Sequence, residues 1–218
     1  ISMHSTGHYI DIRSQLFASH ADHTCAVCGL YQLHEHAVCL HQQGGAFKIT
    51  RLSMYEGLIK SAIIQFKKTG VKKLAPYLAS LYAEFVDIEI YNEVAIAIVP
   101  IPCSHHSLKK RGWDHMMVMA NNLKTTMKVA STVVPALDRV GSHVLKLLDR
   151  NQRISKISQT YRLVESSHKE VWSLLESCEC IVLIDDVVTT GSTMNFCAEL
   201  LHSATKKPIL GVALAGDD

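Results

Sequence analysis

Long apolar runs are absent from this sequence of 218 residues. No run approaches the roughly 20 apolar residues that a membrane-spanning helix needs, which excludes a membrane-embedded protein. The opening stretch ISMHSTGHYI has no basic segment followed by an apolar one, so no secretory signal is visible. It does not begin with Met, and the true start of the protein therefore stays open.

Aromatic residues are also scarce, at 6% of the chain, and neither an internal repeat nor a low-complexity tract is visible. Sparse aromatics would limit the stacking of nucleic-acid bases on this protein. The seven cysteines are odd in number and unevenly spread, which argues against a disulfide framework. Reduced thiols are typical of the cytoplasm, and we expect the protein there.

The net charge is only +2, but the charges are unevenly distributed. Residues 48–75 carry seven Lys and Arg against one Glu, and residues 139–169 carry seven against two acids. The stretch 176–218 instead holds seven acids and two lysines. This uneven distribution of charge suits an anionic partner that lies between basic side chains and a cluster of carboxylates. Most charge runs of this kind, however, are solvated helix faces.

Residues 1–47 differ from the remainder, because they contain seven of the thirteen histidines and three of the seven cysteines. Little apolar periodicity accompanies them, and HQQGGAF reads as a linker. We therefore expect two units: a small amino-terminal Cys/His-rich, zinc-binding-like module with its linker over 1–47, and a main domain over 48–218.

From position 48 onward, apolar runs and helical patterns alternate. SMYE, at 53–56, reads as a capping box that starts a helix, Gly70 reads as its stop, and a second helix follows. Later helices are expected over 114–127 and 193–204, and buried strands over 94–100, 180–184 and 209–214. Strands that alternate with helices predict an α/β fold with a parallel sheet.

The stretch IVLIDDVVTTGST, residues 181–193, joins an expected strand to an expected helix. Asp185 and Asp186 then come at the carboxyl edge of the sheet, where ligands of open α/β sheets bind. Free N–H groups and hydroxyls at the start of the helix form an anion cradle of about the size of a phosphate. We expect the two acids to accept hydrogen bonds from a sugar diol while the turn holds the phosphate. The turn consists of Thr189, Thr190, Gly191, Ser192 and Thr193.

This stretch resembles the signature of type I phosphoribosyltransferases, in which an apolar strand is followed by two acids, two threonines, a glycine and a hydroxyl residue. The resemblance implies the parallel-sheet fold of that family and a site for phosphoribosyl pyrophosphate. A Walker A loop is excluded, because its GK[ST] ending is missing.

A second resemblance narrows the family. VPIPCSHHSLKKRGWDHMMVMANNL, from Val99, is similar to the V-P-[VI]-P segment and R-G-F-N-Q helix of ComF proteins, with Trp113, Asp114 and His115 in place of F-N-Q. FKKTG, at 66–70, resembles the family's F-K-Y-x-G, and CAVC, at 25–28, stands in the place of its cysteine knuckle. The similarity runs from about residue 25 to the end of the chain.

The ComF resemblance implies roles for further residues. Residues 102–106, which include Pro102, Cys103 and Ser104, would form the loop that holds pyrophosphate, and Mg²⁺ would be held mostly by substrate oxygens. Nearby basic residues would neutralise the charge of the leaving group. The implied catalytic set is Asp185, Asp186, Lys109 and Arg111, with Lys110 in substrate binding.

The amino-terminal module contains ligands suited to a structural Zn²⁺. Cys25 and Cys28 supply two thiolates at the usual spacing, and Cys39 supplies a third. His36 is our preferred fourth ligand, His41 is an alternative, and a degenerate knuckle without metal is the competing interpretation.

Two functions follow as hypotheses. The first is a phosphoribosyltransferase-type activity linked to natural competence and DNA uptake, the processes with which ComF proteins are associated. The second is a non-catalytic protein that keeps the fold and binds single-stranded DNA through its basic stretches, alongside the competence machinery. A regulator that uses the pocket as a sensor is a weaker third. The acceptor substrate and the oligomeric state stay open.

Overall fold

The computed structural model describes residues 38–39, 47–69, 72–89, 94–140 and 157–217. Their main feature is a six-stranded sheet in the order β1-β2-β8-β7-β3-β4, in which five strands run parallel and β1 pairs antiparallel to β2 at the edge. The α/β class and the parallel sheet that the sequence predicts are confirmed. The strands of this sheet are β1 (Val38–Cys39), β2 (Phe47–Arg51), β3 (Ile96–Pro100), β4 (Ser131–Val133), β7 (Cys180–Val188) and β8 (Ile209–Gly216).

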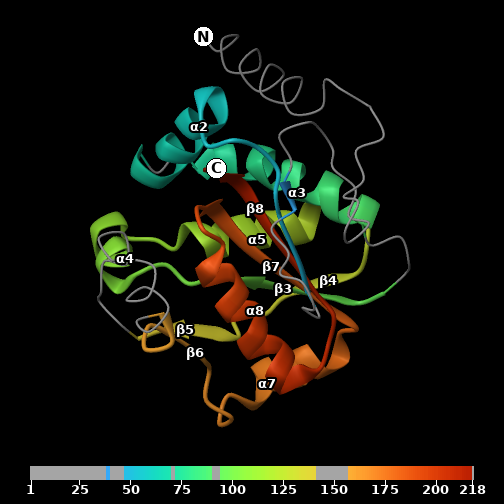
Figure 1. Ribbon diagram of the computed structural model, residues 1–218. Helices are drawn as coiled ribbons and strands as arrows, with labels where there is room; N and C mark the ends of the chain where they lie inside the picture. Colours follow the sequence, from blue (N-terminus) through green and yellow to red (C-terminus); the bar gives the residue numbers. More distant parts are fainter. Residues whose placement is uncertain (1–37, 40–46, 70–71, 90–93, 141–156, 218) are drawn as a thin grey trace.

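Three of these strands have almost entirely apolar sequences because both of their faces are covered. All residues of β3 and β8 are buried, as expected for central strands of a parallel sheet. On β7, Val182 and Ile184 pack into the apolar cluster of α3 and α5, whereas Ile181 and Leu183 pack into the cluster that contains α8. Figure 1 shows α2 and α3 on one side of the sheet and α8 on the other.

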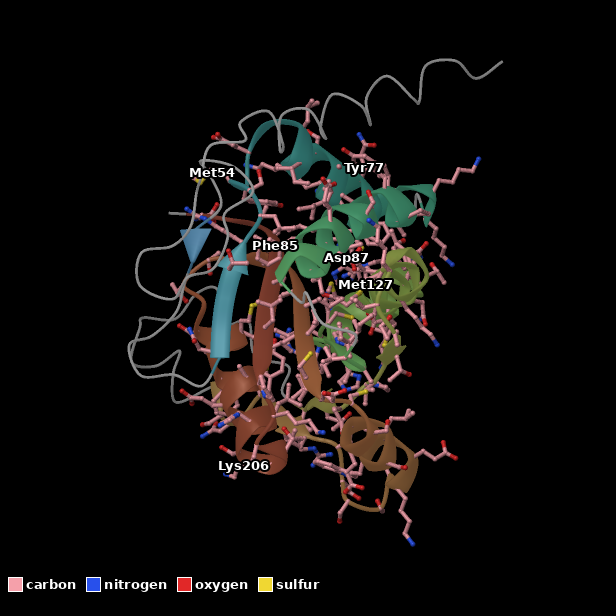
Figure 2. All side chains as sticks on the ribbon, turned by 90° about the vertical axis from the view of Figure 1, so that its right-hand side faces the viewer. Met54, Tyr77, Phe85, Asp87, Met127 and Lys206 are labelled. Atoms are coloured by element: carbon pink, nitrogen blue, oxygen red, sulfur yellow. The ribbon has the colours of Figure 1, made fainter. Side chains whose placement is uncertain are left out.

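The helices on the first face are α2 (Gly57–Thr69), α3 (Ala75–Glu89), preceded by the 3-10 turn η1 (Lys72–Leu74), and α5 (His115–Thr126). The pair α3 and α5 is joined near its ends, where the N–H of Lys128 donates to Asp87 Oδ1 at 3.2 Å. Figure 2 shows Phe85, Asp87 and Met127 close together in this region. A short helix, α4 (His105–Arg111), precedes α5.

The second face is covered by α7 (Lys169–Ser177) and α8 (Ser192–Thr205). A separate two-stranded ladder, β5 (Leu137–Arg139) with β6 (Tyr161–Leu163), also contributes to the core of this face. Lys206, the C-cap of α8, and Met54, which bridges to Gly216 at the carboxyl end of β8, lie at opposite ends of the sheet in Figure 2.

Three local expectations need correction. The capping box is wrong, because Ser53 Oγ donates to the carbonyl of Met54 and α2 begins only at Gly57. Phe47 was read as linker but starts β2, whose place in the sheet depends on pairing with distant β8. Strand β7 does not stop at Ile184, because its ladder with β8 continues to Val188. The division at residue 47 itself stays a prediction.

The connections create a switch point between β3 and β7. The chain leaves β3 through α4 and α5 to reach β4 on one side, and it later returns to place β7 on the other side of β3. In open α/β sheets, ligands bind outside the carboxyl ends of the strands at such a point. Within the described part of the chain, no helix is long and apolar enough to cross a membrane.

Candidate functional site

The loop after β3 and the loop after β7 both leave the sheet at the switch point. The loop after β3 is anchored to β7 by the N–H of Ile101, which donates to the carbonyl of Ile184 at 2.9 Å. The loop after β7 is the hydroxyl-rich turn, which runs from Thr189 into α8 at Ser192. The loop assigned to pyrophosphate therefore leaves the sheet beside Ile184, the residue before the two acids, and the turn assigned to phosphate follows at the end of the same strand.

The hydroxyl-rich turn has the shape of an anion cradle. Gly191 is the N-cap of α8 with φ of 70°, in the left-handed region that glycine adopts without strain. Thr189 and Thr190 are exposed, and the hydroxyls of Thr190 and Ser192 lie 2.9 Å apart. No side chain caps the helix, which leaves its first N–H groups and positive dipole end for an anion.

The two adjacent acids have different surroundings, contrary to our expectation. Consecutive residues of a strand point to opposite faces of the sheet, and both acids lie within β7. Asp186 points to the face of α2 and α5 and is only 6% exposed. Asp185 is only partly buried. In this structure the two carboxylates therefore do not face the same side, and their joint binding of one sugar stays a prediction.

Asp186 is held by two partners on different helices. Oδ1 lies 2.7 Å from the Nζ atom of Lys67 on α2, and Oδ2 accepts from Nε2 of His115 on α5. Burial alone would raise the pKa of this carboxyl, but the charge of Lys67 and the hydrogen bond from His115 outweigh it and hold the pKa well below its usual range. Asp186 therefore stays ionised and has a partner on each oxygen.

His115 links Asp186 to the basic helix α4. Its Nδ1 contacts Nη1 of Arg111, which can only donate. Nδ1 is therefore the acceptor, and the proton of the neutral ring lies on Nε2, facing Asp186. Phe66 and Trp113 pack around this ring, with their own centroids 5.1 Å apart and their planes at 70°. The sequence motifs FKKTG, KKRGW and DD thus meet in one cluster.

Asp185 is less tightly bound to its surroundings. Its Oδ1 accepts from the N–H of Asp186 at 2.9 Å, and its backbone carbonyl accepts from the hydroxyl of Tyr82. Burial and the neighbouring charge of Asp186 raise its pKa to about 7, although Lys67 and Arg139 oppose the rise. A carboxylate in this condition gains from a cation or from sugar hydroxyls.

Sequence reasoning missed two charged residues of the site. Lys67 was noted only as part of FKKTG, and its contact with Asp186 depends on how α2 lies across the sheet. Arg139, at the end of β5, has its guanidinium 5.3 Å from the ring centre of Tyr161 and acts on the charge of Asp185. No motif singles out Arg139, so only the fold could reveal it.

The loop after β3 leads directly into the basic helix. Pro102, Cys103 and Ser104 are partly buried, and Ser104 caps α4 by accepting from the N–H of Ser107 at 3.1 Å. Lys109 and Lys110 are exposed, whereas Arg111 is partly buried against His115. Of the implied basic residues, Arg111 is thus the one that the structure turns inward to the site.

The expected zinc ligands cannot be placed together. Cys25, Cys28, His36 and the alternative His41 lie outside the described residues. Cys39 is the second residue of β1, opposite Thr50 of β2. The zinc module therefore stays a prediction.

Comparison with known proteins adds to this picture. No family model matches the chain. Competence protein ComFC of Bacillus subtilis (strain 168) is 26% identical over 188 residues, which cover 82% of this chain and 71% of that protein. A solved hypoxanthine phosphoribosyltransferase from Staphylococcus aureus shares 10% sequence identity with this chain at a TM-score of 0.35. The match covers 66% of this chain and 64% of the solved chain, which is less than two thirds of its length.

The sheet order and the glycine-containing turn define an open parallel α/β protein with a candidate anion site at its switch point. The relation to ComFC extends over most of the chain and confirms the resemblance drawn from the motifs. The chain is thus similar to a ComF protein over most of its length.

Proposed function

We propose that this protein binds phosphoribosyl pyrophosphate, or a related sugar phosphate, at the switch point of its sheet. The observation that carries the proposal is the turn Thr189–Thr193, in which a left-handed glycine and exposed hydroxyls precede an uncapped helix. This arrangement offers N–H and O–H donors to a phosphate, with the helix dipole adding favourable charge. The loop 102–104 would receive the pyrophosphate end.

The two acids would then have separate roles. Asp185 is the carboxylate available to the ribose hydroxyls, since among the described residues its hydrogen-bond donor is the N–H of Asp186 and not a cation. Asp186 would position rather than bind, because each of its oxygens already contacts a side chain from a helix. Asp185 would thus contact the ligand, whereas Asp186 would hold α2 and α5 against the end of β7.

Mg²⁺ fits the site only in part. A magnesium ion keeps most of its water and phosphate ligands and needs one or two carboxylates, which Asp185 can supply and Asp186 cannot without losing Lys67 or His115. When bound, the ion would neutralise charge on the pyrophosphate. Lys109, Lys110 and Arg111 could stabilise the same leaving group from α4.

A phosphoribosyltransferase-type activity is the chemistry that such a site supports best. The protein would hold the anomeric carbon and the leaving pyrophosphate in line and stabilise the departing charge. Because ComFC is named a competence protein, we extend the proposal to a role in natural competence and DNA uptake in the cytoplasm. A structural Zn²⁺ on Cys25, Cys28, Cys39 and His36 belongs to the same proposal.

The binding proposal is tested by calorimetric titration of phosphoribosyl pyrophosphate with Mg²⁺ into the full chain. Thr190→Val removes an exposed hydroxyl while keeping the shape of the side chain, and Thr190→Ser keeps the hydroxyl. Loss of a hydrogen bond to a charged phosphate should weaken binding by roughly 10- to 100-fold. Thr190→Ser should bind nearly as the unchanged protein does. Equal affinity for all three proteins would refute the phosphate site.

Single-stranded DNA binding is a second candidate function, favoured by an exposed basic corner. Lys68, Lys72 and Lys73 are exposed where α2 ends and η1 begins, and Lys72 lies 5.6 Å from the ring centre of Trp113. Two other residues of the basic stretch do not join them, because Arg51 is buried and Lys67 pairs with Asp186.

The two candidates can be separated in one experiment at fixed salt concentration. Replacement of Lys68, Lys72 and Lys73 by Gln should weaken oligonucleotide binding and flatten its salt dependence. The same triple variant should bind phosphoribosyl pyrophosphate unchanged. If Thr190→Val alone abolishes DNA binding, the strand enters through the sugar-phosphate site instead.

A further inference from the structure

Cys103, Asp114 and His115 bring three kinds of metal-binding atom together beside the switch point. One sulfur, one carboxylate oxygen and one ring nitrogen from these residues all lie within 4.8 Å of one another. Cys103 belongs to the loop after β3, while Asp114 and His115 are the N-cap and first residue of α5. Donors of a tetrahedral zinc site are roughly 3.3–3.8 Å apart, so closure around an ion requires a shift of about 1 Å.

The surroundings of His115 are those of a metal-binding histidine. Such residues usually donate their second ring N–H to a carboxylate, which fixes the tautomer and directs the other nitrogen at the ion. His115 donates from Nε2 to Asp186, and Lys67 holds the second oxygen of that carboxylate at 2.7 Å. The lone pair on Nδ1 is therefore directed at a cation. In this structure that cation is the guanidinium of Arg111, and a metal ion would have to replace it.

The other two donors can provide the matching charge. Cys103 and Asp114 lie close enough to bind one ion together, and burial and the negative charge of Asp114 raise the pKa of the Cys103 thiol. A divalent ion would take the place of the proton of the Cys103 thiol, which passes to solvent, and the thiolate and carboxylate together would balance its two charges. Oδ1 of Asp114 caps α5 by accepting from the N–H groups of Met116 and Met117, so the cap holds the residue in place.

The donor set selects the kind of ion. Sulfur and imidazole ligands suit Zn²⁺ and related transition ions, whereas Mg²⁺ prefers oxygen alone. Arg111 competes for the site, since a guanidinium and a divalent ion cannot both approach Nδ1. Arg111 is partly exposed at the end of the short helix α4 and can turn outward.

From this geometry we infer that Cys103, Asp114 and His115 form a transition-metal site with one position left for water or a ligand, separate from the amino-terminal cysteines. Binding displaces Arg111 from His115. Without the metal ion Arg111 contacts His115, and with the ion bound Arg111 is released toward the loops of the switch point. It does not depend on the proposed sugar-phosphate binding.

The site is tested with Co²⁺, because a thiolate bound to Co²⁺ gives a charge-transfer absorption band. The background is the full chain with Cys25→Ser and Cys28→Ser, which removes the amino-terminal thiol pair. We expect one equivalent of Co²⁺ with this band, displaced by Zn²⁺ and not by Mg²⁺. Cys103→Ser should abolish the band and weaken binding more than 100-fold, an effect larger than the roughly 10- to 100-fold typical of outer partners.

Two matched variants complete the test. Cys180→Ser changes another partly buried thiol, at the start of β7, and should leave the band intact. Asp114→Asn keeps the helix cap but loses the charge, and it should weaken binding at least tenfold with the fold preserved. If the background chain does not fold, the unchanged chain should bind one equivalent more than Cys103→Ser. A band that survives Cys103→Ser, or equal stoichiometry, overturns the proposal.

Discussion

The Nζ atom of Lys67 lies 2.7 Å from Oδ1 of Asp186, and this contact ties the end of α2 to the carboxyl end of β7. His115 holds the other oxygen from α5. One carboxylate thus joins two helices to the central strand, while its neighbour Asp185 lies on the opposite face. Adjacent acids that look equivalent in the sequence therefore have different tasks.

This difference predicts opposite effects of the same substitution. Asp186→Asn should lower the free energy of unfolding by about 3 kcal/mol, the lower end for breaking a buried pair, because Lys67 is 29% exposed. Asp185→Asn should leave stability at pH 7 unchanged or raised, because it removes a carboxylate that burial disfavours. Urea unfolding of both variants measures the contrast. Equal losses would mean that the acids share one role.

The pH dependence of stability should show the same asymmetry. The folded pKa of Asp185 is raised to about 7 from an ordinary value near 4, so its stabilising contribution is complete below about pH 4 and is lost as pH rises through 7. Asp186 has the opposite sign: its lowered pKa gives stability above about pH 4 that is lost only on acidification.

The free energy of unfolding of the unchanged protein and of Asp185→Asn should be measured at pH 5, 6, 7 and 8. The part of the pH dependence that comes from Asp185 should be missing in the variant. The same ionisation should strengthen sugar-phosphate binding with Mg²⁺ as pH rises through 7. A variant whose stability profile runs parallel to that of the unchanged protein would contradict the raised pKa.

The packing of α8 on the sheet depends on Gly211. A Cβ atom there would lie 2.9 Å from Cγ1 of Ile49 and 3.0 Å from Sδ of Met194. Gly211→Ala should therefore cost about 1–3 kcal/mol, as overpacking of a core does. Thermal or urea unfolding gives the value. Combination with Ile49→Ala should cost less than the sum of the two single changes if the clash is the cause.

Trp113 anchors the turn between α4 and α5. Its ring packs edge-on against Phe66, and Lys72 lies over it at 5.6 Å. Trp113→Ala should destabilise the protein by about 3 kcal/mol, whereas Trp113→Phe should lose less because it keeps an aromatic contact. Near-ultraviolet circular dichroism with urea unfolding checks both. A stable Trp113→Ala variant would show that the cluster around His115 does not need this ring.

Some elements could be predicted because their sequence patterns are local. The buried strands β3, β7 and β8 show as apolar runs, since both faces of a parallel sheet are covered. The beginning of α8 shows as a glycine and hydroxyl turn. Strand β2 was missed because Phe47–Arg51 is short and mixed, and its place comes from pairing with β8.

The sequence alone determined the α/β order, the parallel sheet and the hydroxyl-rich turn, because these depend on neighbours a few residues apart. Only the tertiary structure decided which acid meets which partner. Because β7 stays paired with β8 as far as Val188, Asp185 and Asp186 both lie within the strand, and their side chains point to opposite faces of the sheet. Lys67, His115 and Arg139 reach those faces from distant segments, and no local pattern encodes such distances.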